Sequence, residues 1–223
     1  MPVRPDLHID WATHKAATFA CERWHYSKCL PVGKLIKIGA WEDQKFIGCV
    51  IFGRGANRNM LNPYGLEQTQ GCELVRIALT EHKAPVSKIM AHALRMLKQR
   101  EQIELVVSYA DPEAGHHGGV YQAANWTYVG TSSKSVKVFW KGKWRHKKTV
   151  DDAGICQKNL KKRTAEGKHT YVMPLTKRMK SKIQGLARPY PKRVQSIESD
   201  ASGNQSEEGG AIPTCTLQQE LSI

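Results

Sequence analysis

Two short apolar strands joined by an amphipathic helix constrain the fold more than any other feature of this chain. The first strand covers residues 73–79 and the second covers residues 103–109. Between them, from Val86 onward, apolar residues recur at the spacing of one helix face: Ile89, Met90, Ala93, Leu94 and Leu97. A helix between two strands is typical of an α/β sheet. We therefore predict a mixed α/β fold whose ligand site lies at the carboxyl ends of the central strands, where residues 78–86 and 108–117 come side by side.

The remaining apolar segments extend this sheet. Residues 34–53 predict a hairpin that turns at residues 42–44, because alternating apolar positions are followed by a nearly continuous apolar run. A loop rich in Gly, Asn and Pro follows and carries Arg54 and Arg58 outward. Later segments predict a short helix at 120–126 and strands at 127–130, 136–140 and 169–173. The expected architecture is a mixed β-sheet flanked by helices.

Positive charge is concentrated in one part of the chain. The whole chain has 34 Lys and Arg against 20 Asp and Glu, a net charge of +14. Residues 1–133 contribute 15 basic and 12 acidic side chains, whereas residues 134–193 contribute 19 basic and 3 acidic ones, a net charge of +16 for the second block. Such a block repels itself unless a polyanion neutralises it, and nucleic acid is the commonest soluble polyanion. A solvated basic face without a partner is the alternative.

The composition divides the chain into three parts. We predict one folded domain over residues 1–150, a basic extension over residues 151–195 that packs on this domain and contacts the polyanion, and a disordered acidic tail over residues 196–223. No stretch approaches 18 apolar residues and the N-terminus lacks a signal-peptide core, so we expect a cytoplasmic protein without a membrane span. Six cysteines without a C-x-x-C pair indicate neither a zinc ribbon nor a disulfide scaffold.

A cluster of basic residues around one tryptophan is the candidate nucleic-acid contact. The cluster consists of Lys143, Trp144, Arg145, Lys147 and Lys148, and Arg54 and Arg58 of the earlier loop are further candidates. The cations would contact phosphates, and Trp144 would stack on a base or a sugar. A solvated hairpin turn is the alternative.

The turn that follows the strand at residues 73–79 is the candidate cofactor site. A helix N-terminus exposes backbone N–H groups that have no partner within the helix, and such groups can receive a pyrophosphate. The residues assigned to cofactor binding are Leu79, Lys83, Val86, Ser87 and Lys88. An ordinary capped helix is the alternative, because every strand–turn–helix unit makes such an end.

The later part of the predicted sheet resembles the GNAT acyltransferase fold. In residues 121–126 a tyrosine, Tyr121, precedes an aromatic side chain, Trp126, by five residues, as in the last short helix of that fold. The resemblance implies acyl-CoA, for example acetyl-CoA, as cofactor, with the tyrosine near the thioester sulfur. A phenol with a pKa near 10 can protonate a leaving thiolate, so Tyr121 is the candidate general acid.

Several motifs in one order narrow the resemblance to the Mom-type DNA modification proteins of phage Mu and its relatives. The motifs span roughly residues 20–132 and are Trp24-His25-Tyr26-Ser27, residues 38–59, residues 73–79, Pro85-Val86-Ser87, Ser108-Tyr109-Ala110-Asp111 and residues 115–123. The resemblance implies a GNAT-like catalytic domain in residues 1–150. It also implies that the enzyme adds a carbamoylmethyl (methylcarbamoyl) group to the exocyclic amine of adenine and so protects phage DNA from host restriction. Such an enzyme would be phage- or prophage-encoded and would act on double-stranded DNA in the host cytoplasm.

Further catalytic candidates lie in these motifs: Asp111, Arg76, Tyr26, Ser108 and Tyr109. Asp111 ends an apolar strand, where its carboxylate could accept a proton from the adenine amine; capping of the next turn is the alternative. Arg76 alternates with apolar neighbours in its strand, and a surface ion pair with Glu73 or Glu81 is the alternative.

Two histidines, a tyrosine and a carboxylate are the candidate metal ligands: His25, Tyr26, Asp111 and His116. Two histidines and a carboxylate form the facial triad of non-haem iron. The resemblance makes a bound iron plausible, because direct attack of an amine on a thioester would give an acetamide instead of a carbamoylmethyl group. Histidines that only make hydrogen bonds are the alternative.

A base inside a duplex must leave the stack before its amine can react. An aromatic wedge is therefore expected near the site, with Trp126, Trp140 and Tyr64 as candidates. Two other functions stay open: a non-enzymatic DNA-binding protein on a vestigial GNAT fold, and a conventional GNAT N-acetyltransferase. The sequence does not fix the oligomeric state, for which a homodimer is one option.

Overall fold

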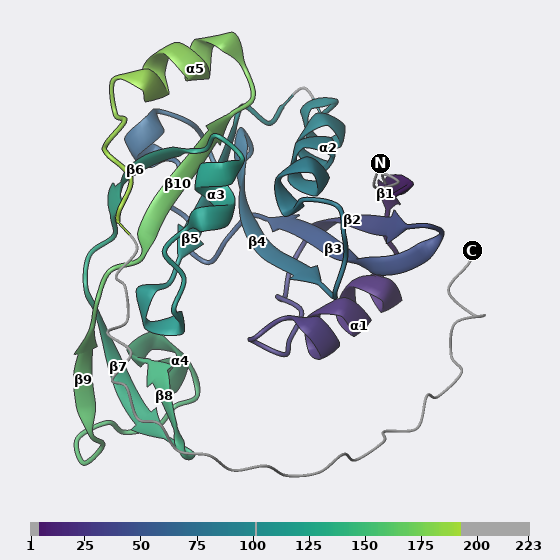
Figure 1. Ribbon diagram of the computed structural model, residues 1–223. Helices are drawn as coiled ribbons and strands as arrows, with labels where there is room; N and C mark the ends of the chain where they lie inside the picture. Colours follow the sequence, from purple (N-terminus) through teal and green to yellow (C-terminus); the bar gives the residue numbers. More distant parts are fainter. Residues whose placement is uncertain (1–4, 101, 193–223) are drawn as a thin grey trace, which may run out of the picture. The chain divides into compact units, whose positions relative to one another are not determined.

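Figure 1 shows the computed structural model, which describes residues 5–100 and 102–192. Its main element is a seven-stranded sheet in the order β1-β2-β3-β4-β5-β10-β6. The strands are β1 (Leu7–Trp11), β2 (Leu35–Glu42), β3 (Lys45–Gly53), β4 (Gly71–Leu79), β5 (Leu105–Ala110), β6 (Thr127–Thr131) and β10 (His169–Pro174). Only β4 and β5 pair in parallel, and all other neighbours pair antiparallel. The predicted mixed α/β sheet flanked by helices is confirmed.

The predicted strand–helix–strand unit is β4, α2 (Val86–Lys98) and β5. The apolar stripe of α2 packs on one sheet face together with the short helix α3 (Gly119–Ala123) and buried residues of β3 and β4. The opposite face of β3 and β4 packs against α1 (His14–Trp24), which starts at a Thr13 cap. The predicted hairpin is β2 and β3, and its turn residues Asp43 and Gln44 have φ of 50° and 65°.

The parallel pair β4–β5 is short and then opens. The two strands pair only over Gly71–Glu73 and Leu105–Val107, although β4 continues to Leu79 and β5 to Ala110. On its other edge β4 stays paired with β3, where a β-bulge leaves Val75 as an extra residue between Leu74 and Arg76. Such bulges bend a strand and re-aim the neighbouring side chains. The fork between β4 and β5 therefore leaves part of the β4 edge without a strand partner.

A second, three-stranded sheet has the order β8-β7-β9. Its strands are β7 (Ser135–Trp140), β8 (Lys143–His146) and β9 (Lys162–Ala165), and the short helices η1 (Asn62–Tyr64), η2 (Pro112–Ala114), α4 (Lys147–Asp152) and α5 (Lys177–Gln184) complete the described structure. The segment predicted as a basic extension thus contributes β9, β10 and α5, and β10 is an internal strand of the large sheet. The predicted acidic tail lies outside the described residues, within which no helix combines the length and hydrophobicity of a membrane span.

Candidate functional site

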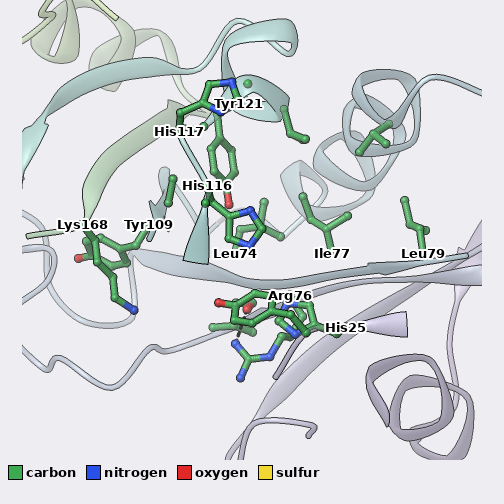
Figure 2. Close-up of a pocket in the computed structure, with 18 of the residues that line it drawn as sticks. His25, Leu74, Arg76, Ile77, Leu79, Tyr109, His116, His117, Tyr121 and Lys168 are labelled. Atoms are coloured by element: carbon green, nitrogen blue, oxygen red, sulfur yellow. Dashed lines mark hydrogen bonds between the residues drawn. The ribbon is translucent and has the colours of Figure 1, made fainter. Parts of the chain in front are cut away.

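A pocket of about 690 Å³ opens at the fork between β4 and β5. β4, the end of α1, the loop that follows β5, and α3 all contribute to its lining. Figure 2 shows that Leu74, Ile77, Leu79 and Tyr121 lie on one side of the β4 ribbon, whereas His25 and Arg76 lie on the other. The volume is in the range of small-molecule and cofactor sites. Residues of both segments predicted to border the site, 78–86 and 108–117, are among those that line this pocket.

Ser108 and Tyr121 meet where the parallel ladder ends. The buried Ser108 Oγ lies 2.9 Å from the Leu74 carbonyl oxygen and 2.8 Å from the Tyr121 hydroxyl oxygen. Burial raises the pKa of Tyr121 above its usual value, and the Ser108 hydroxyl only partly offsets this effect. Tyr121 therefore keeps its proton at neutral pH, as a general acid must.

Glu73 is the carboxylate in this pocket. Burial raises the pKa of Glu73, while the positive charges of Lys168 and Arg76 oppose that rise. Both of these cations and Tyr109 line the same pocket. Burial, together with the Glu73 charge, raises the pKa of Tyr109 to about 12. The pocket thus holds one carboxylate of increased basicity next to phenols that stay protonated.

His25 and Arg76 lie on the other side of β4, and Tyr26 lies between the rings of His25 and His116. The Tyr26 ring lies 4.3 Å from the His25 ring and 5.1 Å from the His116 ring, and Tyr26 is 60% exposed. Burial, and secondarily the Arg76 charge, lowers the pKa of His25 to about 4, so His25 is neutral at pH 7. Arg76 donates to the Val75 carbonyl at 2.7 Å, and its buried Nε has no protein partner. Within the described residues Arg76 forms no ion pair with Glu73 or Glu81, which was the alternative role expected for it.

The four predicted iron ligands do not form one ligand set. Asp111 accepts a hydrogen bond from the Glu113 N–H at 3.1 Å, so it caps the next turn, as the alternative for this residue expected. Asp111 also pairs with Lys168 at 3.2 Å. His25 Nδ1 accepts a hydrogen bond from the Ser27 N–H, which places the proton of the neutral ring on Nε2. Within the described residues no group of three or more His, Cys, Asp or Glu is placed to hold a metal ion. These residues do not fit the predicted facial triad.

The predicted cofactor turn is only partly free to bind an anion. The backbone N–H groups of Lys83 and Ala84 donate to the Glu42 carboxylate at 2.9 and 2.7 Å. The expectation that the N–H groups of this turn are unpaired is therefore wrong for these two residues. Leu79 and Val86 line the pocket, whereas Lys83, Ser87 and Lys88 lie outside its lining.

The predicted nucleic-acid cluster lies on the three-stranded sheet. Lys143, Trp144 and Arg145 belong to β8, and Lys147 and Lys148 begin α4. The Trp144 ring packs edge-on against Phe139, with centroids 5.4 Å apart, and the guanidinium of Arg163 lies 4.9 Å from its centre. Arg54 and Arg58 are exposed in the loop after β3, as predicted.

Glu113 links this sheet to the pocket loop. Its carboxylate pairs with Lys137 of β7 and with Arg163 of β9, the latter at 3.1 Å. Glu113 belongs to η2, directly before the pocket-lining residues 115–118. Two cations of the basic sheet are therefore paired with one carboxylate of the segment that borders the pocket.

Two of the three predicted aromatic wedges are buried in the core, and the third, Trp140, lies outside the pocket lining. Trp126 is fully buried and packs on Tyr121, and Tyr64 is buried against β5 and α5. The Lys141 ammonium and the Arg145 guanidinium lie 4.7 and 5.3 Å from the centre of the Trp140 ring. Trp140 is not among the residues that line the pocket. Trp126 and Tyr64 are core residues because their rings complete the packing of the large sheet.

Glu73 and Tyr171 are two site residues that sequence reasoning missed. Tyr171 stacks on Tyr121 at 5.0 Å and 29°, and its hydroxyl donates to the His117 carbonyl at 2.8 Å. Gly118, with φ of 86°, allows the loop to lie against Tyr171, since a Cβ there would overlap its ring. A signal for Glu73 was available, because a carboxylate within an apolar strand needs a reason to be there. For Tyr171, 50 residues beyond Tyr121, local sequence gives no signal.

Comparison with known proteins gives two sequence matches. The model of a family described as the Mom protein family matches residues 6–192. The methylcarbamoylase Mom of Escherichia phage Mu is 26% identical over 204 residues, covering 84% of each chain.

Solved structures that are similar to this chain include two N-acetyltransferases and an N-acyl amino acid synthase. An N-acetyltransferase from Staphylococcus aureus Mu50 is 13% identical with a TM-score of 0.45, covering 76% of this chain and 98% of its own. FeeM, an N-acyl amino acid synthase from uncultured soil microbes, is 11% identical with a TM-score of 0.47, and the match covers 79% of this chain and 94% of FeeM. A spermidine N-acetyltransferase from Vibrio cholerae is 10% identical with a TM-score of 0.43, and the match covers 76% of this chain and 95% of the acetyltransferase.

Proposed function

This chain belongs to the Mom protein family, and on that premise we propose that it is a DNA-modifying transferase that adds a carbamoylmethyl (methylcarbamoyl) group to the exocyclic amine of adenine. The name of the phage Mu relative, a methylcarbamoylase, supports this reaction. One observation carries the proposal: a single pocket contains the protonated Tyr121 and the enclosed Glu73 carboxylate. Transfer to an amine uses both functions, a base for the amine and an acid for the leaving group.

The donor side of the pocket is the side of Tyr121. Leu74, Ile77, Leu79 and Val86 line it with apolar surface, and the β4 edge beyond Glu73 has no strand partner on the β5 side. The Leu74 and Val75 carbonyls accept side-chain hydrogen bonds, but β4 from Arg76 to Leu79 has no β5 partner. Such an edge beside apolar side chains suits an extended chain with amide groups, such as the pantetheine arm of acyl-CoA. Acyl-CoA, when bound, would supply a thioester and a thiolate leaving group; attack of the adenine amine on its carbonyl alone would give an amide, so these residues account for the acid and base steps and not for the carbon–nitrogen bond of the carbamoylmethyl group. Tyr121 holds the proton that such a thiolate would take.

The acceptor side is the side of His25, Tyr26 and Arg76. The exposed Tyr26 ring offers a stacking surface for an adenine that has left the duplex. Glu73 accepts a proton from the adenine amine, and Arg76, which lines the same pocket, orients the base. His25 is neutral and adds no charge that would repel Arg76.

The three-stranded sheet supplies the sequence-independent DNA contacts in this proposal. Its candidate phosphate contacts are Lys143, Arg145, Lys147 and Lys148, with Trp144 as a stacking surface. Most of the net positive charge of the chain lies in the block that contains this sheet. Phosphate contacts position a protein on DNA without reading sequence, so this sheet would hold the duplex while the pocket acts on one base.

Nucleoside mass spectrometry of DNA from bacteria that express the protein tests this function. We expect deoxyadenosine that carries a carbamoylmethyl group, and resistance of that DNA to restriction enzymes whose sites contain adenine. Glu73→Gln and Tyr121→Phe should each lower the modified fraction by roughly 10²-fold, the usual effect of losing an acid or a base. Glu81→Gln, at an exposed carboxylate outside the pocket lining, is the matched control and should leave it unchanged.

Two other results would replace the proposal. An acetyl group on an amine would identify a conventional N-acetyltransferase, because attack on a thioester carbonyl gives an amide. Unmodified DNA, together with tight DNA binding by the purified protein, would identify a DNA-binding protein without this activity.

A further inference from the structure

The loop between α1 and β2 carries the most exposed large apolar side chain of the described structure. Val32 has a relative exposure of 103%, whereas the other exposed large apolar residues range from 36% to 60%. It stands between Pro31 and Gly33, whose φ is 122°. Single exposed apolar residues are common on protein surfaces, so the surroundings of Val32 decide whether it has a role.

The loop that carries Val32 is fixed to the body of the protein. Leu30 packs against the buried cluster between α1 and β3. The Ser27 N–H donates to His25 Nδ1 at 3.1 Å, and the Lys28 ammonium donates to the Arg23 carbonyl at 2.8 Å. Residues 27–30 of the loop are therefore held, the hydrogen bond to His25 ties them to the pocket wall, and Val32 projects from this base.

The loop that carries Val32 is cationic and begins at the acceptor side of the pocket. The loop starts directly after Tyr26, which lines the pocket and contacts His116. Lys28 and Lys34, both exposed, flank the apolar tip. Proteins that unstack a duplex insert an apolar wedge between bases while nearby cations contact the phosphates.

We propose that the loop of residues 27–34 is the wedge that opens the duplex, with Val32 entering the base stack beside the adenine that Tyr26 receives. This inference rests on the proposed function, because only chemistry on a paired base requires such a wedge. It also supplies the element that the buried Trp126 and Tyr64 cannot. Lys28 and Lys34 then contact the phosphates on either side of the opened step.

A wedge is needed for duplex DNA and not for single-stranded DNA, which distinguishes it from other roles of this loop. A base in single-stranded DNA is already unpaired, so its modification needs no wedge. We expect Val32→Ser to lower modification of duplex DNA by about tenfold and to leave modification of single-stranded DNA unchanged. Val32→Leu keeps an apolar tip and should retain duplex activity.

The experiment uses one phage genome in two forms, the single-stranded circle and its double-stranded replicative form. Both are incubated in clarified lysate from bacteria that express the full-length protein, since the lysate supplies the donor, and modified deoxyadenosine is measured by nucleoside mass spectrometry. Leu186→Ser, at another exposed apolar residue (41% exposed), is the control and should match the parent on both forms. Equal activity of parent and Val32→Ser on the duplex, or an equal loss on both forms, would overturn the wedge. If the parent protein modifies neither form, the proposed function itself fails.

A second measurement is independent of donor and sequence context. A mixed-sequence duplex in which 2-aminopurine replaces part of the adenine becomes more fluorescent when that base unstacks. The parent protein and Val32→Leu should raise the fluorescence, whereas Val32→Ser should not. This measurement decides the question if the parent modifies only the duplex, and an equal rise with Val32→Ser would then refute the wedge.

Discussion

At the residue scale, the single hydroxyl hydrogen of Ser108 sets the direction of the proton on Tyr121. Ser108 Oγ is within hydrogen-bond distance of both the Leu74 carbonyl and the Tyr121 hydroxyl, but it can donate to only one of them. If it donates to Leu74, Tyr121 must turn its own hydrogen toward Ser108. If it donates to Tyr121, the phenol hydrogen is free to face the pocket. Ser108 is thus a positioning residue for Tyr121.

Replacing Tyr121 by Phe tests this arrangement. The ring stack with Tyr171 stays possible, so the fold should be retained, while loss of the proton donor should lower DNA modification by roughly 10²-fold or more. Circular dichroism checks the fold, and nucleoside mass spectrometry checks the activity. Unchanged modification at equal protein level would remove Tyr121 from the mechanism.

His25 makes the stability of the fold depend on pH. Burial lowers its pKa from 6.5 to about 4 in the folded chain, so the unfolded chain binds this proton more readily. The contribution of the neutral ring is fully present above pH 6.5 and is lost as the pH falls toward 4, and the loss amounts to about 3 kcal/mol. His25→Asn should remove this part of the pH dependence. Urea unfolding of both proteins at pH 7 and pH 4.5 measures this pH dependence. If the free energy of unfolding falls by the same amount between the two pH values in the parent and in His25→Asn, the prediction is wrong.

At the element scale, η2 connects chemistry and DNA contact through Glu113. Its carboxylate pairs with Lys137 and Arg163, so these cations are not fully available to phosphates. We expect Glu113→Gln to raise DNA affinity and to steepen its salt dependence, since the variant has one more net positive charge on this surface. The same change loosens the pocket loop and should lower modification. Binding titrations at several salt concentrations, with the activity assay, test this pair of opposite effects, and a fall in affinity would contradict it.

The strand β8 and the start of α4 carry the predicted phosphate contacts. Replacing Lys143, Arg145, Lys147 and Lys148 by Gln should weaken binding to DNA of any sequence. The slope of log affinity against log salt should flatten by about one unit for each phosphate that the variant no longer neutralises. A quadruple variant that keeps the salt slope of the parent would show that this surface does not bind DNA.

The elements that sequence predicts best are those with a clear apolar period. The hairpin β2–β3 and the unit β4–α2–β5 each repeat apolar residues at one spacing, and all five elements were predicted. The strands β8 and β9 have four residues each and are mostly charged, so their pairing with β7 leaves little local signal. The strand β10 was predicted, but its place between β5 and β6 depends on residues far apart in the chain. The local sequence indicates Glu73 only as a surface ion-pair partner of Arg76. Its burial results from the packing of the folded sheet, so the local sequence did not predict it.

At the scale of the whole molecule, net charge governs the association with DNA. Residues 198–223 contain five acidic and no basic side chains, so removing them leaves 34 basic and 15 acidic residues and raises the net charge from +14 to +19. A deletion of these residues, which lie outside the described structure, should leave DNA affinity unchanged or raise it. Equilibrium binding of both proteins to one duplex measures this. Weaker binding by the shortened protein would show that this segment contributes directly.

The internal position of β10 also has a consequence for how the enzyme is made. A ribosome translates residues 162–165 of β9 before residues 169–174 of β10, so the nascent chain carries all strands of the basic sheet before the strand that brings Tyr171 to Tyr121. A message that stops early would release a strongly cationic fragment without a complete pocket. Because β10 lies between β5 and β6, the reading frame must be translated through Pro174 before the large sheet can close.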